Sequence, residues 1–176
     1  MNIKHLSLAL IAAASATVAM ADTGTITFNG LVVADTCTTT LTGGASATAV
    51  TLPTVPTTAL AVAGNTAGQT PFSLSVTGCG AAAATSGIRY TLTPSAYHTN
   101  NNSLLDNTGT AANVGVEILE GATAIAFAGA PKQTSTVTLT SGAGSVSLAA
   151  RYRATGPTPA TAGTVTSALG WTLVYN

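Results

Sequence analysis

The sequence predicts an all-β protein built as a sandwich of two sheets, and three observations support this prediction. Apolar side chains recur at every second residue in several short segments, which is the period of a strand with one covered face. Glycine, proline and asparagine separate these segments at the spacing typical of a β-sandwich. Residues that favour long helices are scarce, and charged residues make up only 6% of the chain. The expected fold class is therefore an all-β, immunoglobulin-like sandwich.

Residues 1–21 have the features of a secretory signal peptide rather than of a folded domain. A positively charged start precedes an apolar run over residues 6–14, and Ala19-Met20-Ala21 provides the small residues of a cleavage site. The apolar run is too short and too often interrupted by serine for a membrane span. We expect cleavage after Ala21, with cleavage after Ala19 as the alternative.

Charge and cysteine content narrow the possible partners. Five Lys and Arg residues balance five Asp and Glu residues, and the basic ones are scattered, so no nucleic-acid partner is expected. Export places Cys37 and Cys79 in an oxidising compartment, where a disulfide is the expected state. Closing a loop of this length stabilises a fold by about 4 kcal/mol in the chain-entropy model.

The alternation of apolar and polar residues predicts where the strands lie along the chain. Residues 22–29 carry Gly24, Ile26 and Phe28 on one face, and an apolar run, Leu31–Val33, resumes after Gly30. These two pieces form either one bent strand or a detachable arm followed by a first strand. Further strands are expected at residues 49–52, 72–76, 88–92, 114–118, 124–127, 136–140 and 146–153, the last two as a pair, and residues 95–109 are expected to form a polar surface loop.

The last strand, residues 164–176, has the strongest pattern in the chain. Nearly all of its bulk lies on the face formed by the odd positions, which are Val165, Ser167, Leu169, Trp171, Leu173 and Tyr175. So apolar a strand needs a neighbour on each side, and no residues follow it to provide one. Its free edge must be covered by an earlier segment or by another molecule, and we favour another molecule.

No catalytic site is expected. Glu117 and Glu120 lie three residues apart on a strand, so they point to opposite faces and cannot act as an acid–base pair. His98 lies in an asparagine-rich segment and is expected to be solvated rather than to act as a base or ligand. Arg151 and Arg153 share one face, which we expect to be a solvated sheet face. Motifs of nucleotide-binding proteins, hydrolases and zinc enzymes are absent from the sequence, so we expect no enzyme activity, cofactor or metal.

Several features occur together in a fixed order. GTITFNGLVVADTC comes first, then FSLSVTGC with the second cysteine, then LAARYRATG, and finally AGTVTSALGWTLVYN with its penultimate tyrosine. In this combination the chain resembles the major pilin subunits of chaperone–usher fimbriae of Gram-negative bacteria, the type 1 and P-pilus-like family. The likeness spans essentially the whole mature chain.

The resemblance implies an incomplete immunoglobulin-like sandwich, with a pilin domain over residues 30–176 that lacks one strand. A periplasmic chaperone would fill the gap first, and the N-terminal extension of the next subunit would then replace it. Residues 22–29 would be this donor-strand extension, with Gly24, Ile26 and Phe28 entering the groove. An arm of eight residues spans only about 26 Å, so either cleavage is earlier, or exchange begins differently, or the groove is short.

The groove would lie between Leu31–Val33 and the terminal strand. The implied acceptor-groove and chaperone-binding residues are Val165, Leu169, Trp171, Leu173, Tyr175 and Asn176. The terminal carboxylate of Asn176 would be held by basic residues of the chaperone.

The implied function is that of a structural pilus subunit. It would polymerise head to tail by donor-strand exchange into a surface filament used in adhesion and biofilm formation. The expected partners are identical subunits, the chaperone and an outer-membrane usher, and the expected location is the cell-surface fimbrium, reached through the periplasm. The alternatives are a minor or adaptor pilin of the same system, and a self-contained secreted β-sandwich binding module.

Overall fold

Two antiparallel sheets form in the computed structural model, which describes residues 37–42, 49–81, 83 and 87–175. The larger sheet has the strand order β1-β2-β9-β6-β5-β4, with β7 paired to β6, and the smaller sheet has the order β10-β3-β8. The signal peptide, the expected donor strand, Leu31–Val33 and Asn176 lie outside the described residues. The elements are β1 (Thr38–Thr42), the 3-10 helix η1 (Thr57–Leu60), β2 (Thr66–Thr77), β3 (Ile88–Pro94), β4 (Tyr97–His98), β5 (Asn101–Leu105), β6 (Val114–Glu120), β7 (Thr123–Ala124), β8 (Lys132–Gln133), β9 (Gly144–Ala154) and β10 (Leu169–Tyr175).

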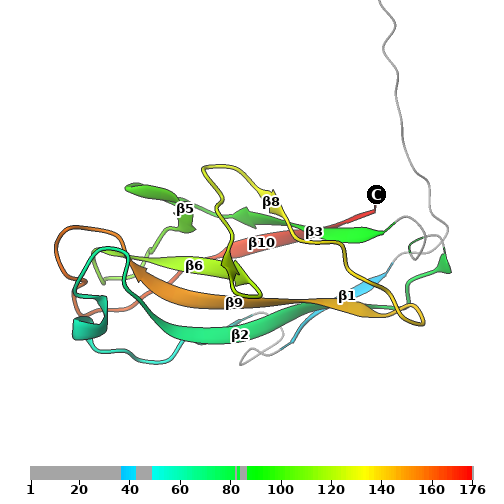
Figure 1. Cartoon of the computed structure of the whole chain (residues 1–176), viewed down its shortest axis with the longest axis horizontal. Helices are drawn as coiled ribbons and strands as arrows, with labels where there is room; N and C mark the ends of the chain where they lie inside the picture. The colour runs from blue at the N-terminus through cyan, green and yellow to red at the C-terminus, as the bar shows by residue number, and fades with distance from the viewer. Residues whose placement is uncertain (1–36, 43–48, 82, 84–86, 176) are drawn as a thin grey trace, which may run out of the picture. The chain divides into compact units, whose positions relative to one another are not determined.

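The centre of the larger sheet is formed by β2, β9 and β6, which lie side by side (Figure 1). On β2, the buried residues Phe72, Leu74 and Val76 alternate with serines, as the sequence predicts for a strand with one covered face. Phe72 lies opposite Leu148 of β9, so apolar side chains of neighbouring strands meet on one face. This face forms one half of the core.

The smaller sheet supplies the other half of the core. Ile88, Tyr90 and Leu92 of β3 are fully buried, and β10 pairs with β3 in a register that sets Leu173 opposite Tyr90. In Figure 1, β10 runs next to β3 as the red strand. It is the edge strand of its sheet among the described residues, because β8 pairs with the far side of β3.

Two expected elements differ from the structure. The segment 95–109 is not a plain surface loop, because it contains the hairpin β4–β5, and Leu104 and Leu105 anchor this hairpin by burial. Residues 136–140 do not form a strand beside β9. They make only isolated bridges, with Val137 opposite Ile88, because β2 and β6 already occupy both edges of β9.

Of two other expected strands, one is shorter than predicted and one does not form a named strand. The segment 124–127 contains only the end of the two-residue strand β7, although Phe127 is fully buried in the core. Residues 49–52 lie outside the named strands.

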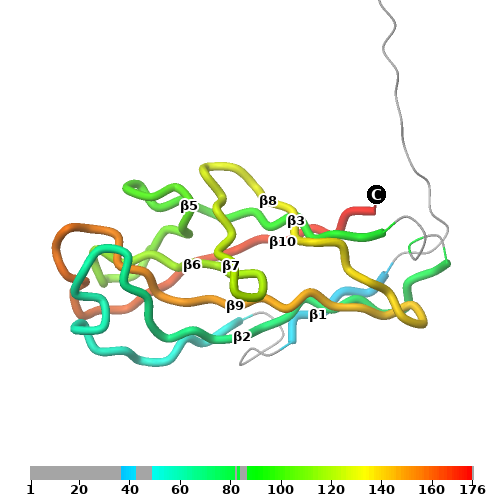
Figure 2. Tube along the Cα trace, viewed as in Figure 1, coloured from blue at the N-terminus to red at the C-terminus, as the bar shows by residue number. Residues whose placement is uncertain are grey.

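A second, smaller apolar cluster lies beyond the end of the main core. Leu60 of η1 packs there with Val114 and with Ala160, which comes from the segment between β9 and β10. Figure 2 shows this segment turning at the same end of the sheets as η1. The segment then leads into β10, so this cluster positions the start of the terminal strand.

Candidate functional site

A groove of about 640 Å³ runs along the edge of β10 and of the segment that precedes it. One wall is formed by residues 165–169 and Trp171, and the opposite wall by Leu41 and residues 49–52. The floor consists of side chains from the larger sheet, namely Phe72, Leu74, Leu105, Val116, Ile118, Ala150 and Tyr152.

The groove opens onto the hydrophobic core itself. Phe72, Val116 and Ile118 belong to the main core cluster, yet they also form the floor of the groove. Surface clefts of soluble proteins rarely expose core side chains in this way, because burial of apolar surface is the main force that drives folding. The gap has the position and the apolar character of a missing strand.

The terminal strand shows the predicted period but not full burial. Val165, Ser167, Leu169, Leu173 and Tyr175 are half-buried, and every even residue from Thr166 to Thr172 is exposed. The inward-facing Trp171 is the exception among the odd residues, with 37% of its surface exposed. The bulkiest side chain of the strand is therefore only partly covered.

One edge of this strand is hydrogen-bonded, and the opposite edge faces the groove. The carbonyl of Ala168 accepts a hydrogen bond from the Ser95 N–H at 3.0 Å, and that of Thr166 accepts one from the Thr108 N–H at 2.9 Å. Consecutive residues of a strand direct their backbone groups to opposite edges. The backbone groups of the odd residues therefore point into the groove, where the sheet order gives β10 no neighbour among the described residues.

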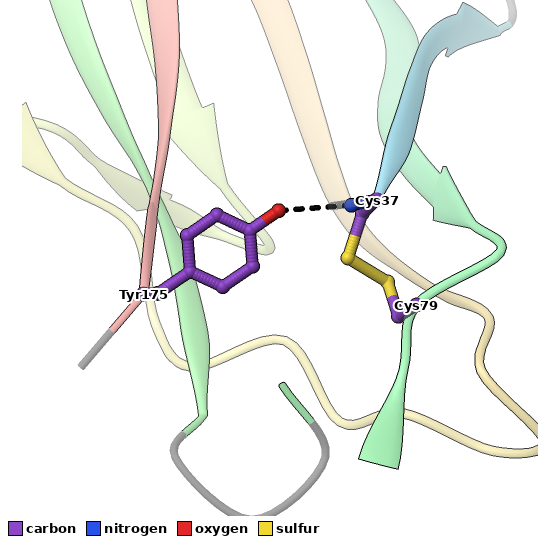
Figure 3. The surroundings of a disulfide bond; sticks show 3 residues. All are labelled: Cys37, Cys79 and Tyr175. Atoms are coloured by element: carbon purple, nitrogen blue, oxygen red, sulfur yellow. Dashed lines mark hydrogen bonds between the residues drawn. A yellow bond between two sulfur atoms is a disulfide. The ribbon is translucent and has the colours of Figure 1, made fainter. Parts of the chain in front are cut away.

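The end of the groove near the C-terminal end of β10 is closed. The Tyr175 hydroxyl accepts a hydrogen bond from the Cys37 N–H at 2.9 Å, and the expected disulfide joins Cys37 to Cys79, as Figure 3 shows. This contact ties β10 of one sheet to the residue directly before β1 of the other. Leu173 and Tyr175 pack against the core but do not line the cavity.

Tyr90 lies directly beneath this part of the groove wall. Its ring meets Trp171 edge to face, with ring centroids 5.7 Å apart. The Tyr90 hydroxyl is buried without a hydrogen-bond partner. Burial, with a smaller contribution from the nearby Tyr175, raises the pKa of Tyr90 to about 12.

A buried ion-pair cluster lies on the opposite face of the larger sheet. Glu117 is 3% exposed, and its carboxylate oxygens lie 2.6 Å from Arg151 Nη2 and 2.6 Å from Arg153 Nη1. The two arginines do share a face, but they surround a buried carboxylate rather than a simply solvated surface. Glu120 points elsewhere and accepts a hydrogen bond from the Ser135 N–H at 2.9 Å.

The expectation that His98 is solvated is wrong. His98 is only 8% exposed, because the β4–β5 hairpin folds it onto the larger sheet near Gly115. Its Nδ1 accepts a hydrogen bond from the Asn100 N–H at 3.2 Å, and its Nε2 lies 3.2 Å from the Thr155 hydroxyl. Because Nδ1 is an acceptor, the neutral ring carries its proton on Nε2 and donates to Thr155.

A second cavity, of about 500 Å³, continues from the open end of the groove. It is lined by η1 and by residues 160–165, and it shares Tyr152 and Val165 with the groove. The apolar path along β10 is therefore closed at Tyr175 and open towards Val165.

The structure brings together only some of the predicted site residues. Val165, Leu169 and Trp171 line the groove, whereas Gly24, Ile26, Phe28 and Asn176 lie outside the described residues. The sequence pattern predicted a strand at residues 49–52 but gave no indication that these residues and Leu41 form a wall of the groove. The only local signal was a weak apolar alternation that ends at Pro53.

The described residues contain no group of three or more His, Cys, Asp or Glu side chains placed to hold a metal ion. Within the same ranges, no helix has the length and apolar character needed to cross a bilayer.

Comparisons with known proteins give a consistent result. The model of the family described as "Fimbrial protein" matches residues 26–176. The chain is 37% identical to the F17 fimbrial protein of Escherichia coli, over 96% of each chain. It is 38% identical to the major fimbrial subunit SMF-1 of Stenotrophomonas maltophilia, over 93% of this chain and 99% of the relative. A solved chaperone–usher pilus, studied for rod uncoiling, shares the fold with a TM-score of 0.62 at 16% identity, over 92% of this chain and 100% of that chain.

Proposed function

This chain belongs to the fimbrial protein family, and we propose that it is the repeating subunit of a chaperone–usher pilus. Subunits join head to tail when the N-terminal arm of one fills the groove of the next. The resulting filament is displayed at the cell surface, where it serves adhesion and biofilm formation. The family is structural, and the chain is not an enzyme.

The observation that carries the proposal is the open groove along β10. A groove whose floor is the core, and whose β10 rim has no strand neighbour among the described residues, fits an extended segment that adds a strand. Backbone hydrogen bonds of the added strand supply affinity, and its alternate side chains replace the missing part of the core. Because the donor arm and the groove are formed by different segments of the chain, the contact is heterologous and generates a filament rather than a closed dimer.

The partners follow from the state of the groove before assembly. A subunit with an exposed core aggregates unless another molecule covers that core. A periplasmic chaperone therefore has to occupy the groove first. At the outer membrane, an usher then replaces the chaperone with the arm of the next subunit. The described fold is shared with a subunit of a chaperone–usher pilus. Similarity to a relative described as a major fimbrial subunit favours the shaft over a minor or adaptor position.

The test is deletion of residues 22–29 from the exported chain, with electron microscopy of surface filaments. We expect no filaments, while the shortened subunit still accumulates in complex with the chaperone. The matched control replaces Thr23, Thr25 and Thr27 by serine, which changes the outer face of the arm but leaves its inward residues intact. Normal filaments from the deletion variant, or a purified mature chain that is a stable monomer without any partner, would contradict the proposal.

A further inference from the structure

We propose that Asn107, Thr110 and Thr164 are positioning residues for the groove, although none of the three lines it. Their side chains hold residues 164–168 in place as a docking edge, which is the groove-facing backbone of the segment that leads into β10. This inference rests on the proposed function. It adds the residues outside the groove that control how well the groove binds an extended segment.

The groove is longer than the sheet that supports its wall. Strand β3 ends at Pro94, which lies opposite Leu169, the first residue of β10. Residues 165–168 also line the groove, but they precede β10 and lie beyond the residue pairs that β10 makes with β3. Half-buried and exposed residues alternate through them, as in an extended strand. This part of the wall therefore needs a second support.

The second support is the bend formed by residues 106–112, which lies between β5 and β6. Its backbone donates to the wall. The Thr108 N–H bonds to the Thr166 carbonyl at 2.9 Å, and the Ala111 N–H bonds to the Thr164 carbonyl at 3.0 Å. In a regular antiparallel ladder, the N–H groups of Thr164 and Thr166 would donate back to carbonyl groups of a partner strand. The bend is not a strand, so these two N–H groups need other acceptors.

Side chains of the bend provide those acceptors. The Thr166 N–H donates to Asn107 Oδ1 at 2.9 Å. The Thr164 N–H donates to Thr110 Oγ1 at 2.9 Å, and the Thr110 N–H donates in turn to Thr164 Oγ1 at 3.1 Å. The two threonines thus exchange hydrogen bonds between side chain and backbone. Thr164 and Thr166 are each held at the carbonyl by the backbone of the bend and at the N–H by one of its side chains.

The Asn107 amide has a fixed orientation. Its Oδ1 also accepts a hydrogen bond from the Gly109 N–H at 2.8 Å, and its Nδ2 donates one to the Ala111 carbonyl at 2.7 Å. Rotation of the amide would break these bonds within the bend. The acceptor that Asn107 offers to the Thr166 N–H is therefore set by the bend itself.

The wall cannot move closer to the bend, because two glycines already bring the two backbones into contact. A Cβ atom at Gly163 would lie 2.5 Å from the Ala111 nitrogen, and a Cβ atom at Gly109 would overlap the Thr164 carbonyl. The hydrogen bonds oppose movement the other way, into the groove. Contact on one side and hydrogen bonds against the opposite movement fix the position of the docking edge.

A fixed docking edge lowers the cost of binding an extended segment. The backbone groups of Val165 and Ser167 point away from the bend and into the groove, where an added strand can bond to them. If residues 164–168 had to be ordered at the moment of binding, the lost conformational freedom would weaken the affinity. The side-chain bonds to the bend are exposed, so water replaces them readily when they are removed. Their loss should therefore affect binding more than folding.

The test measures binding of a labelled peptide of residues 22–29 to the mature chain by fluorescence polarisation. The double variant Thr110→Val with Thr164→Val keeps side-chain size but loses the exchanged hydrogen bonds. It should bind the peptide about tenfold more weakly, because one hydrogen bond changes an equilibrium constant by about two- to tenfold. Its midpoint of urea unfolding without peptide should change little. The matched control is Thr108→Val, because the Thr108 hydroxyl donates to the Thr166 carbonyl, which the Thr108 N–H already binds. This control should bind the peptide as the unmodified chain does.

Asn107→Ala gives an independent second variant. It removes the acceptor of the Thr166 N–H and leaves the exchange between the two threonines in place. Peptide binding should be about two- to tenfold weaker. Unchanged affinity would overturn the role of Asn107.

Amide hydrogen exchange locates the effect along the docking edge. On the unmodified chain, the peptide should protect the N–H groups of Val165, Ser167, Leu169 and Trp171. In the double variant, protection should be lost at Val165 and Ser167 but kept at Leu169 and Trp171, which β3 positions. A uniform loss at all four residues, or an unchanged affinity, overturns the positioning role and leaves the proposed function intact. No binding of the peptide to the unmodified chain overturns both.

Discussion

Replacement of Glu117 by glutamine should be one of the most destabilising conservative changes in the larger sheet. The Glu117 carboxylate is almost fully buried, with Arg151 Nε at 2.7 Å and Arg153 Nη1 at 2.6 Å. The change Glu117→Gln keeps the shape but leaves two guanidinium groups facing each other without an anion. Removing one partner of a buried ion pair costs about 3–5 kcal/mol.

The loss of stability caused by Glu117→Gln should lie at the lower end of that range. The arginine side chains are 24% and 34% exposed, so each guanidinium group recovers some hydration after the carboxylate is neutralised. We therefore expect a loss of about 3 kcal/mol, which lowers the melting temperature by about 6–12 °C for a domain of this size.

Urea unfolding of the mature chain measures this loss, with Trp171 as the only tryptophan reporter and with a peptide of residues 22–29 held at a fixed concentration to fill the groove. Glu120→Gln is the matched control, because Glu120 is more exposed and accepts its hydrogen bonds from Ser135 rather than from an arginine. Replacing Glu117, Arg151 and Arg153 together by leucine and methionines should recover most of the stability. A loss below about 1 kcal/mol, or equal losses in the two glutamine variants, would refute the reasoning.

Three further outcomes are expected from stability measurements. Replacing Cys37 and Cys79 by serine should cost about 4 kcal/mol in chemical denaturation, and an unchanged midpoint would contradict the role of the disulfide. Because the pKa of Tyr90 is raised from 10.0 to about 12, its neutral form stabilises the fold below pH 10, and this contribution is lost as pH rises through about 12. Melting curves at increasing alkaline pH should therefore show a smaller decline in a Tyr90→Phe variant, and parallel declines would argue against the assignment. His98→Ala should cost about 1–3 kcal/mol because it leaves the Asn100 N–H and the Thr155 hydroxyl without their partner, and a neutral effect would show that water replaces the ring.

Periodicity predicted the strands that carry large alternating side chains. The segments around Phe72, Tyr90 and Val116 formed strands because one apolar face has to be buried whatever the neighbour is. The terminal strand showed the same pattern, and its half-burial agrees with β10 having only β3 as a neighbour among the described strands. The alternation of apolar residues is sufficient to predict these strands, because each strand has to bury its own apolar face.

The remaining features depend on contacts distant in sequence. Residues 136–140 alternate as well as a strand does, but β2 and β6 already occupy both edges of β9, the strand with which they were expected to pair. The burial of His98 required a hairpin anchored by Leu104 and Leu105 to fold back onto another strand. The second wall of the groove is defined by its position opposite β10 rather than by its own composition, so no local signal marked residues 49–52 as part of a groove.

The hydrogen bond between Tyr175 and Cys37 has a mechanical consequence. In the proposed filament, the N-terminal arm of each subunit continues along the chain to Cys37, which is hydrogen-bonded to Tyr175 of β10. A load on the arm therefore enters the subunit at Cys37, where the disulfide couples the start of β1 covalently to the end of β2. The load is thus distributed over a covalently cross-linked sheet and does not fall on a single edge strand.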